Sequence, residues 1–492
     1  MRSDFLRPLR SPAGSEHVSA ARIAESVLAT GPAATDVSAF HRAREAAQDR
    51  IYTHAERVPL TSLADWRTSP DEDAVRHRSG RFFAVEGISV RVAGAAVPAW
   101  DQPIIHQPEV GVLGMLMKDF DGIAHFLVQL KAEPGNRDGL QLSPTVQATR
   151  SNYTGVHRGK AVPYLEYFRK APPDRVLADV RQSEQGAWFL RKHNRNIVVE
   201  TGEDVEVLDG FHWLTLAQIH RLLAGDDLVN MDARTVLSCL PFAAPRLLER
   251  FAPGRGGLAA ALLRSCDADE GSLHRTSQLL SWITEGRTRA QVEVESVPLS
   301  ELTQWRRGPD GISHRSGRFF EVIGVRVEAA GREVGRWSQP MIAAPAPGLL
   351  ALLVTRFDGV LHALMQLRVE PGLRDVAELA PTVQCTPENY TELPAEARPP
   401  FLDLVLGAGP GGGRRSVLFD TMLSDEGGRF HHVSNRHLIV ETDERPEHPG
   451  YRWMTVHQLT GLLRHSHYLN VQARSLLACL HTLTASASAS AS

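Results

Sequence analysis

Apolar and polar residues alternate along several segments of this chain, and other segments show helical spacing. Residues 81–92 (RFFAVEGISVRV) alternate over the length of a strand, and residues 123–133 and 194–200 have further strand patterns. Helical spacing occurs at 215–223 and 229–240, and around residues 40–50. Strands followed by packed terminal helices are typical of α+β folds. The pattern therefore predicts an α+β unit with a mixed sheet.

This whole pattern occurs twice. The heptapeptide HRSGRFF at 77–83 recurs letter for letter at 314–320, and FDG, EPG, PTVQ and NYT follow it in the same register both times. Such a repeat indicates a duplicated domain. We predict an N-terminal arm (1–35), a first repeat (36–242), a helical linker broken by proline and glycine (243–268), a second repeat (269–480) and a disordered tail (481–492).

Composition and charge narrow the class of protein. The 492 residues carry a net charge of −3, which gives no electrostatic reason to bind nucleic acid or a membrane surface. The N-terminus lacks the apolar segment of a secretory signal, and no apolar run approaches the ~20 residues that span a bilayer. The four cysteines, in no metal-binding spacing, indicate reduced thiols. We therefore expect a cytoplasmic protein.

A polar stretch at 129–157 is the strongest candidate for a binding site. Amides, hydroxyls, charged groups and a tyrosine follow a predicted strand there at high density, which suits a ligand with several hydroxyl groups. Gln129, Lys131 and Glu133 alternate along the strand and so share one face. A solvated loop of turn-forming residues is the alternative interpretation. EPG, PTVQ and NYT occur in both repeats, which favours a constrained role.

Differences between the repeats indicate which one carries the chemistry. Some polar residues of the first repeat have unrelated counterparts in the second: His106, Gln107, Ser143, Ser151, His157 and Lys192 become Ala343, Ala344, Ala380, Glu388, Pro394 and Val433. The second repeat looks eroded. We predict that the first repeat is catalytic and the second is not, and the histidines near 431 and 465 lack the spacing of a metal site.

Several long phrases carry a family resemblance. WDQPIIHQPEVGVLG (100–114), HFLVQLKAEPGN (125–136), QLSPTVQATRSNYT (141–154), QSEQGAWF (182–189) and VNMDARTVLSC (229–239) resemble the NDP-hexose 2,3-dehydratase family. The resemblance implies a duplicated Nudix-like module, a homodimer, and no metal ion or cofactor. It implies a substrate that is a dTDP-linked 4-keto-6-deoxyhexose, and a dTDP-3,4-diketo-2,6-dideoxyhexose product on the way to antibiotic deoxysugars. A downstream 3-ketoreductase is the implied partner.

For this chemistry the resemblance and the polar stretch together suggest roles. Glu133 or His157 is the candidate base, with Glu184 as a rival, and Tyr153 is the candidate acid. Lys131 would donate to the enolate oxygen or, alternatively, contact the pyrophosphate. The expected substrate-binding residues are Gln107, Gln129, Gln147, Thr149, Ser151, Asn152, Glu184 and Arg195. A non-catalytic sugar-nucleotide-binding protein is the second hypothesis, and a nucleotide-sugar hydrolase or isomerase is the third.

Overall fold

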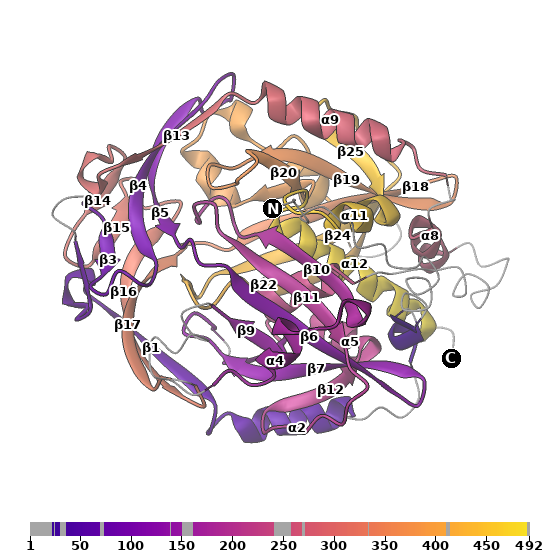
Figure 1. The fold of residues 1–492 in the computed structure, drawn as a ribbon. Coiled ribbons are helices and arrows are strands. Elements are labelled where there is room, and N and C mark those ends of the chain that lie inside the picture. The colour runs from indigo at the N-terminus through magenta and orange to yellow at the C-terminus, as the bar shows by residue number, and fades with distance from the viewer. Residues whose placement is uncertain are drawn as a thin grey trace, which may run out of the picture.

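The computed structural model confirms an α+β fold in which the same arrangement occurs twice. It describes residues 22–23, 25–29, 36–68, 73–137, 139–149, 161–240, 257–267, 271–332, 334–409 and 414–489, with side chains to 484. Within these residues each repeat contributes one large sheet and most of one small sheet. Figure 1 shows the small sheets on the left and helices α5, α8, α11 and α12 gathered on the right.

The large sheet of the first repeat is mixed. Its order is β10-β11-β6-β7-β12, with β9 on β6 and β8 on β7, and only β11 and β6 run parallel. The strands are β6 (Gly111–Phe120), β7 (Ile123–Ala132), β8 (Leu140–Pro144), β9 (Val146–Ala148), β10 (Val176–Ser183), β11 (His193–Glu200) and β12 (Phe211–Thr215).

The second repeat builds the equivalent sheet in the same way. Its order is β20-β19-β18-β24-β22, with β21 on β18 and β25 on β19. The strands are β18 (Gly348–Phe357), β19 (Val360–Val369), β20 (Ala377–Ala380), β21 (Val383–Cys385), β22 (Arg415–Ser424), β24 (Ser434–Thr442) and β25 (Tyr451–Thr455).

The two small sheets exchange their first strands between the repeats. Strand β1 (Tyr52–Val58) of the first repeat pairs with β16 (Glu321–Ala330), and β13 (Val292–Val297) of the second pairs with β4 (Ala84–Val92). The remaining strands are β2 (Trp66–Thr68), β3 (Val75–His77), β5 (Ala99–His106), β14 (Trp305–Arg307), β15 (Gly311–His314), β17 (Arg336–Ala343) and β23 (Phe430–His431). Since each small sheet needs a strand from the other repeat, neither repeat is complete alone.

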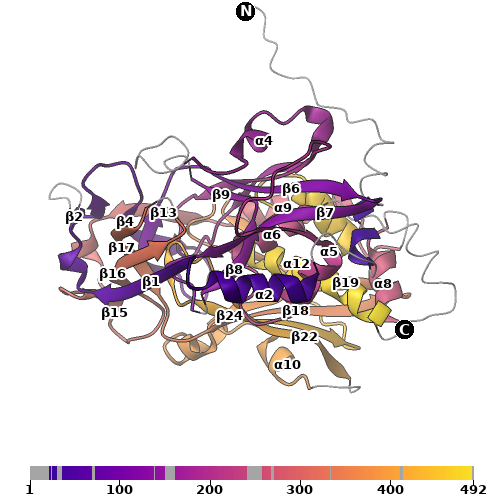
Figure 2. The same ribbon diagram turned by 90° about the horizontal axis from the view of Figure 1, so that it is seen from below.

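Helices α5, α6 and α12 lie between the two large sheets, as Figure 2 shows, and they bury apolar faces in one core shared by both repeats. Helices α4 and α10 pack instead on the outer faces of the two sheets, in separate apolar clusters. The helices are α2 (Val37–Ala47), α4 (Leu165–Arg169), α5 (Leu216–Leu223), α6 (Met231–Ser238), α8 (Leu258–Ser265), α9 (Thr276–Arg289), α10 (Leu402–Leu406), α11 (Val456–Leu463) and α12 (Val471–Ala489), with short 3₁₀ turns at η1 (Leu60–Ser62), η2 (Pro173–Arg175), η3 (Leu299–Glu301), η4 (Pro387–Thr391) and η5 (Ala395–Ala397). Among the described helices none is long and apolar enough to cross a membrane.

Three segments outside the two predicted repeats contact the repeats in the structure. Residues 258–265, placed in the linker, form α8, whose Ser265 hydroxyl donates to Leu361 O and accepts from Val456 N. Ser26, placed in the N-terminal arm, makes the same two contacts with Ala124 O and Leu216 N. The tail predicted to be disordered from residue 481 continues α12 to Ala489, because alanine favours helix and Leu483 packs into the shared core.

A pair of buried arginines joins the repeats at the centre. Arg234 of α6 donates to Ser475 Oγ at 2.7 Å and to Ser424 O at 2.5 Å in the second repeat. Arg474 of α12 donates to Thr235 Oγ1 at 2.6 Å and to Ser183 O at 2.5 Å in the first. Each guanidinium therefore replaces its lost hydration with hydrogen bonds across the interface.

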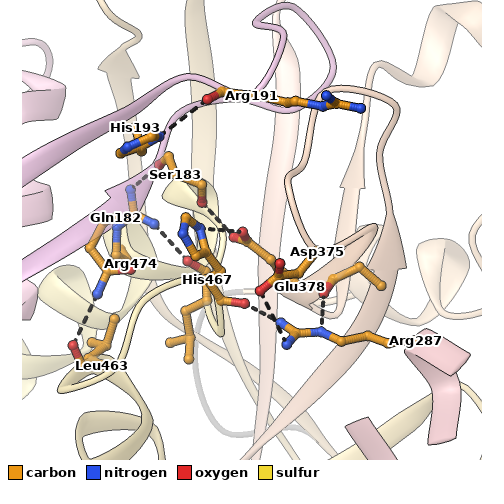
Figure 3. Close-up of polar contacts among 12 residues, drawn as sticks. Gln182, Ser183, Arg191, His193, Arg287, Asp375, Glu378, Leu463, His467 and Arg474 are labelled. Carbon is orange, nitrogen blue, oxygen red and sulfur yellow. Dashed lines mark hydrogen bonds and ion pairs between the residues drawn. The ribbon is translucent and has the colours of Figure 1, made fainter. Parts of the chain in front are cut away.

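A buried acid, Glu378, lies near Arg474. Figure 3 shows Glu378 between Ser183 of the first repeat and His467 of the second. The Ser183 hydroxyl donates to Glu378 Oε2 at 2.5 Å, and His467 Nδ1 is 3.8 Å from Oε1. Burial raises the pKa of Glu378 from 4.5 to about 7. The first repeat has Gln141 at this position, and it hydrogen-bonds Ser424 in the same manner.

We expect Glu378→Gln to stabilise the protein at pH 8 but not at pH 5. Below pH 4.5 the carboxyl is protonated in both the folded and the unfolded chain and does not oppose folding. Because its pKa is about 7 in the folded protein, the unfolded chain ionises first as the pH rises from 4.5, so stability falls until the pH has passed about 7. The amide cannot ionise, so the free energy of unfolding in urea should increase by about 2 kcal/mol at pH 8. An equal change in the free energy of unfolding at both pH values, or a decrease at pH 8, would show that burial does not raise the pKa of Glu378.

Candidate active site

One cavity of about 580 Å³ lies where the two repeats meet. The HRSGRFF loop, strands β7 and β9 and the start of α6 form its first-repeat walls, and β17 and the segment 426–429 form its second-repeat wall. Its ionisable lining comprises Asp65, His77, Arg78, Glu109, Lys131, Glu133, Glu184, Lys192 and Asp232 from the first repeat and Arg332, Arg336, Glu426 and Arg429 from the second. Such a mixture of buried acids and cations is typical of acid–base sites.

A lysine and a carboxylate meet at the end of strand β7. Lys131 is the next-to-last residue of the strand and is half-buried, and Glu133 begins the EPG turn that follows the strand. Lys131 Nζ donates to Gln147 O at 3.2 Å, and Gln147 Nε2 donates to Glu133 Oε1 at 2.8 Å. Strand β9 therefore holds both groups against the cavity through one glutamine.

The orientation of Gln147 is itself fixed. Its Oε1 accepts from Ser143 Oγ at 2.8 Å and from Asn230 Nδ2 at 3.1 Å, which leaves Nε2 to face Glu133. Asn230 is the N-cap of α6, and its Oδ1 accepts from Ala233 N at 2.8 Å. The cap thus links the start of α6, and with it Asp232, to the Glu133 carboxylate.

A second acid and lysine lie at the ends of strands β10 and β11. Asn194 Nδ2 donates to Glu184 Oε1 at 2.5 Å, and Lys192 Nζ donates to Glu109 O. Burial lowers the pKa of Lys192 to about 8, although Glu184 partly opposes this change. Burial raises the pKa of Glu184 despite the nearby Arg474 and Lys192.

Asp232 adds a third buried carboxyl from the first turn of α6. Burial raises its pKa well above the usual value, and the neighbouring carboxylates Glu184, Glu133 and Glu426 raise it further. Lys131 acts in the opposite direction. The acids of the cavity are therefore coupled by charge, and they cannot all ionise together at little cost.

The second repeat reaches into this cavity through residues 426–429. Gly135 N donates to Gly427 O at 2.7 Å, and a Cβ on Gly427 would lie 2.9 Å from Cβ of Glu133. This close approach requires glycine and places Glu426 and Arg429 on the cavity wall. Arg429 Nε donates to Gln107 Oε1 at 3.2 Å, and its guanidinium lies 4.2 Å from the centroid of the Phe83 ring.

The structure brings together much of the site predicted from sequence. Lys131, Glu133, Gln107, Gln147, Thr149 and Glu184 line the cavity. Gln129 and Arg195, both described, are not among the lining residues: Gln129 is half-buried in β7 between β8 and β12, and Arg195 is ion-paired with Asp179 at 2.7 Å on β10. Ser151, Asn152, Tyr153 and His157 lie outside the described residues.

Sequence reasoning missed Asp232, Asn194, Glu426 and Arg429. Asp232 has Gln472 as its counterpart, so the comparison of repeats that singled out Lys192 could also have found it. Glu426 stands in LSDEG, the phrase that corresponds to QSEQG, within the repeat that the sequence predicts to be non-catalytic. Nothing in the local pattern shows that this segment faces the other repeat's cavity.

The fold and the cavity define a duplicated α+β protein with one acid–base site built by both repeats. The family model for NDP-hexose 2,3-dehydratase matches residues 37–240 and again 276–480. The chain therefore belongs to the NDP-hexose 2,3-dehydratase family, and it is an enzyme of the dehydratase class.

Three relatives carry the name dTDP-4-dehydro-6-deoxy-alpha-D-glucopyranose 2,3-dehydratase. The protein from Amycolatopsis orientalis is 46% identical over 444 residues, covering 89% of this chain and 88% of the relative. That from Saccharopolyspora spinosa is 48% identical over 437 residues, covering 87% and 88%. That from Streptomyces violaceoruber is 47% identical over 456 residues, covering 91% and 98%.

Proposed function

We propose that this enzyme removes water across C2–C3 of dTDP-4-keto-6-deoxyglucose, giving dTDP-3,4-diketo-2,6-dideoxyglucose. The names of the relatives support the substrate. The observation that carries the chemistry is the Lys131–Gln147–Glu133 arrangement, which places a carboxylate and an ammonium group on one wall of the cavity.

The C3 hydrogen of such a substrate is α to the C4 carbonyl, so a base can remove it if the enolate at O4 is stabilised. Glu133 is the base, since its carboxylate lines the cavity and is held in position by the Gln147 amide. Lys131 donates to O4 as negative charge develops there. The C2 hydroxyl, β to the carbonyl, then leaves with a proton. The resulting enol takes a proton at C2 to become the 3,4-diketone.

The second repeat would hold the nucleotide end of the substrate. Arg332, Arg336 and Trp337 line the cavity on that side, and Arg332 lies 5.6 Å from the Trp337 ring centroid. Guanidinium groups recognise diphosphate oxygens, and an indole offers a face for a base. In the first repeat, Gln107 and Thr149 would bind the sugar hydroxyls.

The remaining expectations form part of the same proposal. A 1,2-diketone is reactive, so an enzyme that reduces C3 would consume the product, as expected on a route to antibiotic deoxysugars. The mixed large sheet of each repeat, with β11 parallel to β6, supports the Nudix-like module that the family resemblance implies. We also expect a homodimer in the cytoplasm.

Incubation with dTDP-4-keto-6-deoxyglucose in deuterated water tests this function. We expect the substrate to lose one water, which mass spectrometry would detect. After a 3-ketoreductase has trapped the product, we expect one solvent deuterium at C2. Release of free nucleotide would instead identify a hydrolase. Unchanged substrate that nevertheless binds would support a non-catalytic sugar-nucleotide-binding protein.

A further inference from the structure

We propose that Glu426 of the second repeat is the acid that protonates the departing C2 hydroxyl in the cavity of the first repeat. This inference rests on the proposed dehydration and adds to it the group that completes the elimination. It also gives the second repeat a direct part in catalysis, where the sequence alone predicts Tyr153 of the first repeat as the acid.

Glu426 lies on the cavity wall next to the proposed base, but it belongs to the other repeat. Both Glu426 and Glu133 line the cavity, and their segments are tied by the Gly135 N–Gly427 O hydrogen bond of 2.7 Å. A substrate between the repeats would therefore present C3 to one carboxyl and the C2 oxygen to the other. An elimination needs its base and its acid as separate groups, and each repeat supplies one of them to the same cavity.

The hydrogen bonds of the two carboxyls suit opposite roles. Glu133 Oε1 accepts a hydrogen bond from Gln147 Nε2 at 2.8 Å, which fixes the carboxyl in position. Glu426 Oε1 accepts from Gly428 N at 2.9 Å, whereas its buried Oε2 has no hydrogen-bond partner among the described residues. A buried oxygen of this kind is costly as a carboxylate and is relieved by a proton that it can donate to a ligand.

The surrounding charges point in the same direction. Burial raises the pKa of Glu426, the Glu133 carboxylate raises it further and Glu184 adds to this, while Arg429 and the Gly428 amide lower it. Separation of two neighbouring carboxyls into one ionised and one protonated group is the usual basis of paired acid–base catalysis.

The counterpart of Glu426 in the first repeat cannot do this chemistry. QSEQG aligns with LSDEG, so Gln185 stands where Glu426 stands, and the Gln185 amide donates to Asp425. The segment that crosses from the first repeat toward the second therefore carries an amide that cannot supply a proton. Of these two equivalent positions only Glu426 carries an acid, and it lines the cavity that contains the first-repeat residues.

The proton and electron balance of the step is complete. The enolate pair at C3–C4 forms the C2=C3 double bond as the C4 carbonyl reforms, and the C2–O bond breaks with its pair going to oxygen. The Glu426 proton moves to that oxygen, and water leaves. Glu133 holds the C3 proton and Glu426 is a carboxylate; exchange with solvent restores both groups.

Glu426→Gln tests the proposal by separating C3 exchange from elimination. In deuterated water the variant should still exchange the C3 hydrogen of dTDP-4-keto-6-deoxyglucose at near the wild-type rate, because Glu133 is intact. Its rate of water loss should fall by about 10²–10⁴-fold. Retained exchange also demonstrates that the variant is folded and binds substrate. Glu444→Gln, which alters a surface carboxylate paired with Arg415 at 2.6 Å, is the control and should match wild type in both rates.

Other outcomes overturn the assignment. Equal loss of exchange and elimination, or no loss of either, means that Glu426 is not the acid for the C2 hydroxyl. The same conclusion follows if Tyr153→Phe, assayed in parallel, shows the separation and Glu426→Gln does not. Wild-type enzyme that neither exchanges C3 nor loses water would instead refute the proposed function, a result visible before any variant is compared.

Discussion

Glu133→Gln should abolish both C3 exchange and dehydration while leaving substrate binding within a few-fold of wild type. The amide keeps the size of the carboxyl and can still meet Gln147, but it cannot accept the C3 proton. Since every later step needs the enolate, exchange and water loss should fall together, by about 10²–10⁴-fold or more. Both rates are measured by mass spectrometry in deuterated water, and binding by calorimetry with dTDP.

The second repeat offers a matched control for this substitution. Glu370 occupies the same position, is buried, and accepts from Gln384 Nε2 at 2.7 Å. Glu370→Gln should therefore perturb packing as much as Glu133→Gln does, yet retain activity. If the two variants lost activity equally, the effect would be structural, and if Glu133→Gln still exchanged C3 at the wild-type rate, another group would be the base.

The elements of the fold could be predicted because their signals are local. The alternation at 81–92 became β4, and the patterns at 123–133 and 194–200 became β7 and β11. The exchange of β1 and β13 could not be predicted, because a strand pattern gives the buried face but not the partner. The pairing of Tyr52 with Ala330 and of Val292 with Val92 depends on the tertiary arrangement.

The candidate site shows the same limit. Lys131, Glu133 and Gln147 lie within one polar stretch of the first repeat, so sequence brought them together. Arg195 was expected to bind substrate, but β11 directs it to Asp179 on the neighbouring strand. Glu426 was overlooked because its role arises only where the two repeats meet, and an alignment of one repeat on the other treats each as a separate unit.

Because Arg474 donates hydrogen bonds across the interface between the repeats, we expect Arg474→Met to lose much stability. Arg474 is 1% exposed, and its guanidinium donates to Thr235 Oγ1 and Leu469 O at 2.6 Å and to Ser183 O at 2.5 Å. Methionine fills part of the volume but leaves buried acceptors without donors and removes a cation near Glu378 and Glu184. We expect the free energy of unfolding in urea to fall by about 3–5 kcal/mol.

Arg436→Met is the matched surface control for this experiment. Arg436 makes a two-point ion pair with Asp420 at 2.7 and 2.6 Å, but both side chains are well exposed, so its loss should cost no more than about 1 kcal/mol. Arg234→Met should resemble Arg474→Met, because the two arginines make equivalent contacts across the interface. Equal effects of the buried and surface substitutions would mean that the repeats are held together by their apolar core and exchanged strands alone. A large loss for both buried arginines would show that the polar centre of the interface is needed to hold together the two repeats that line the candidate site.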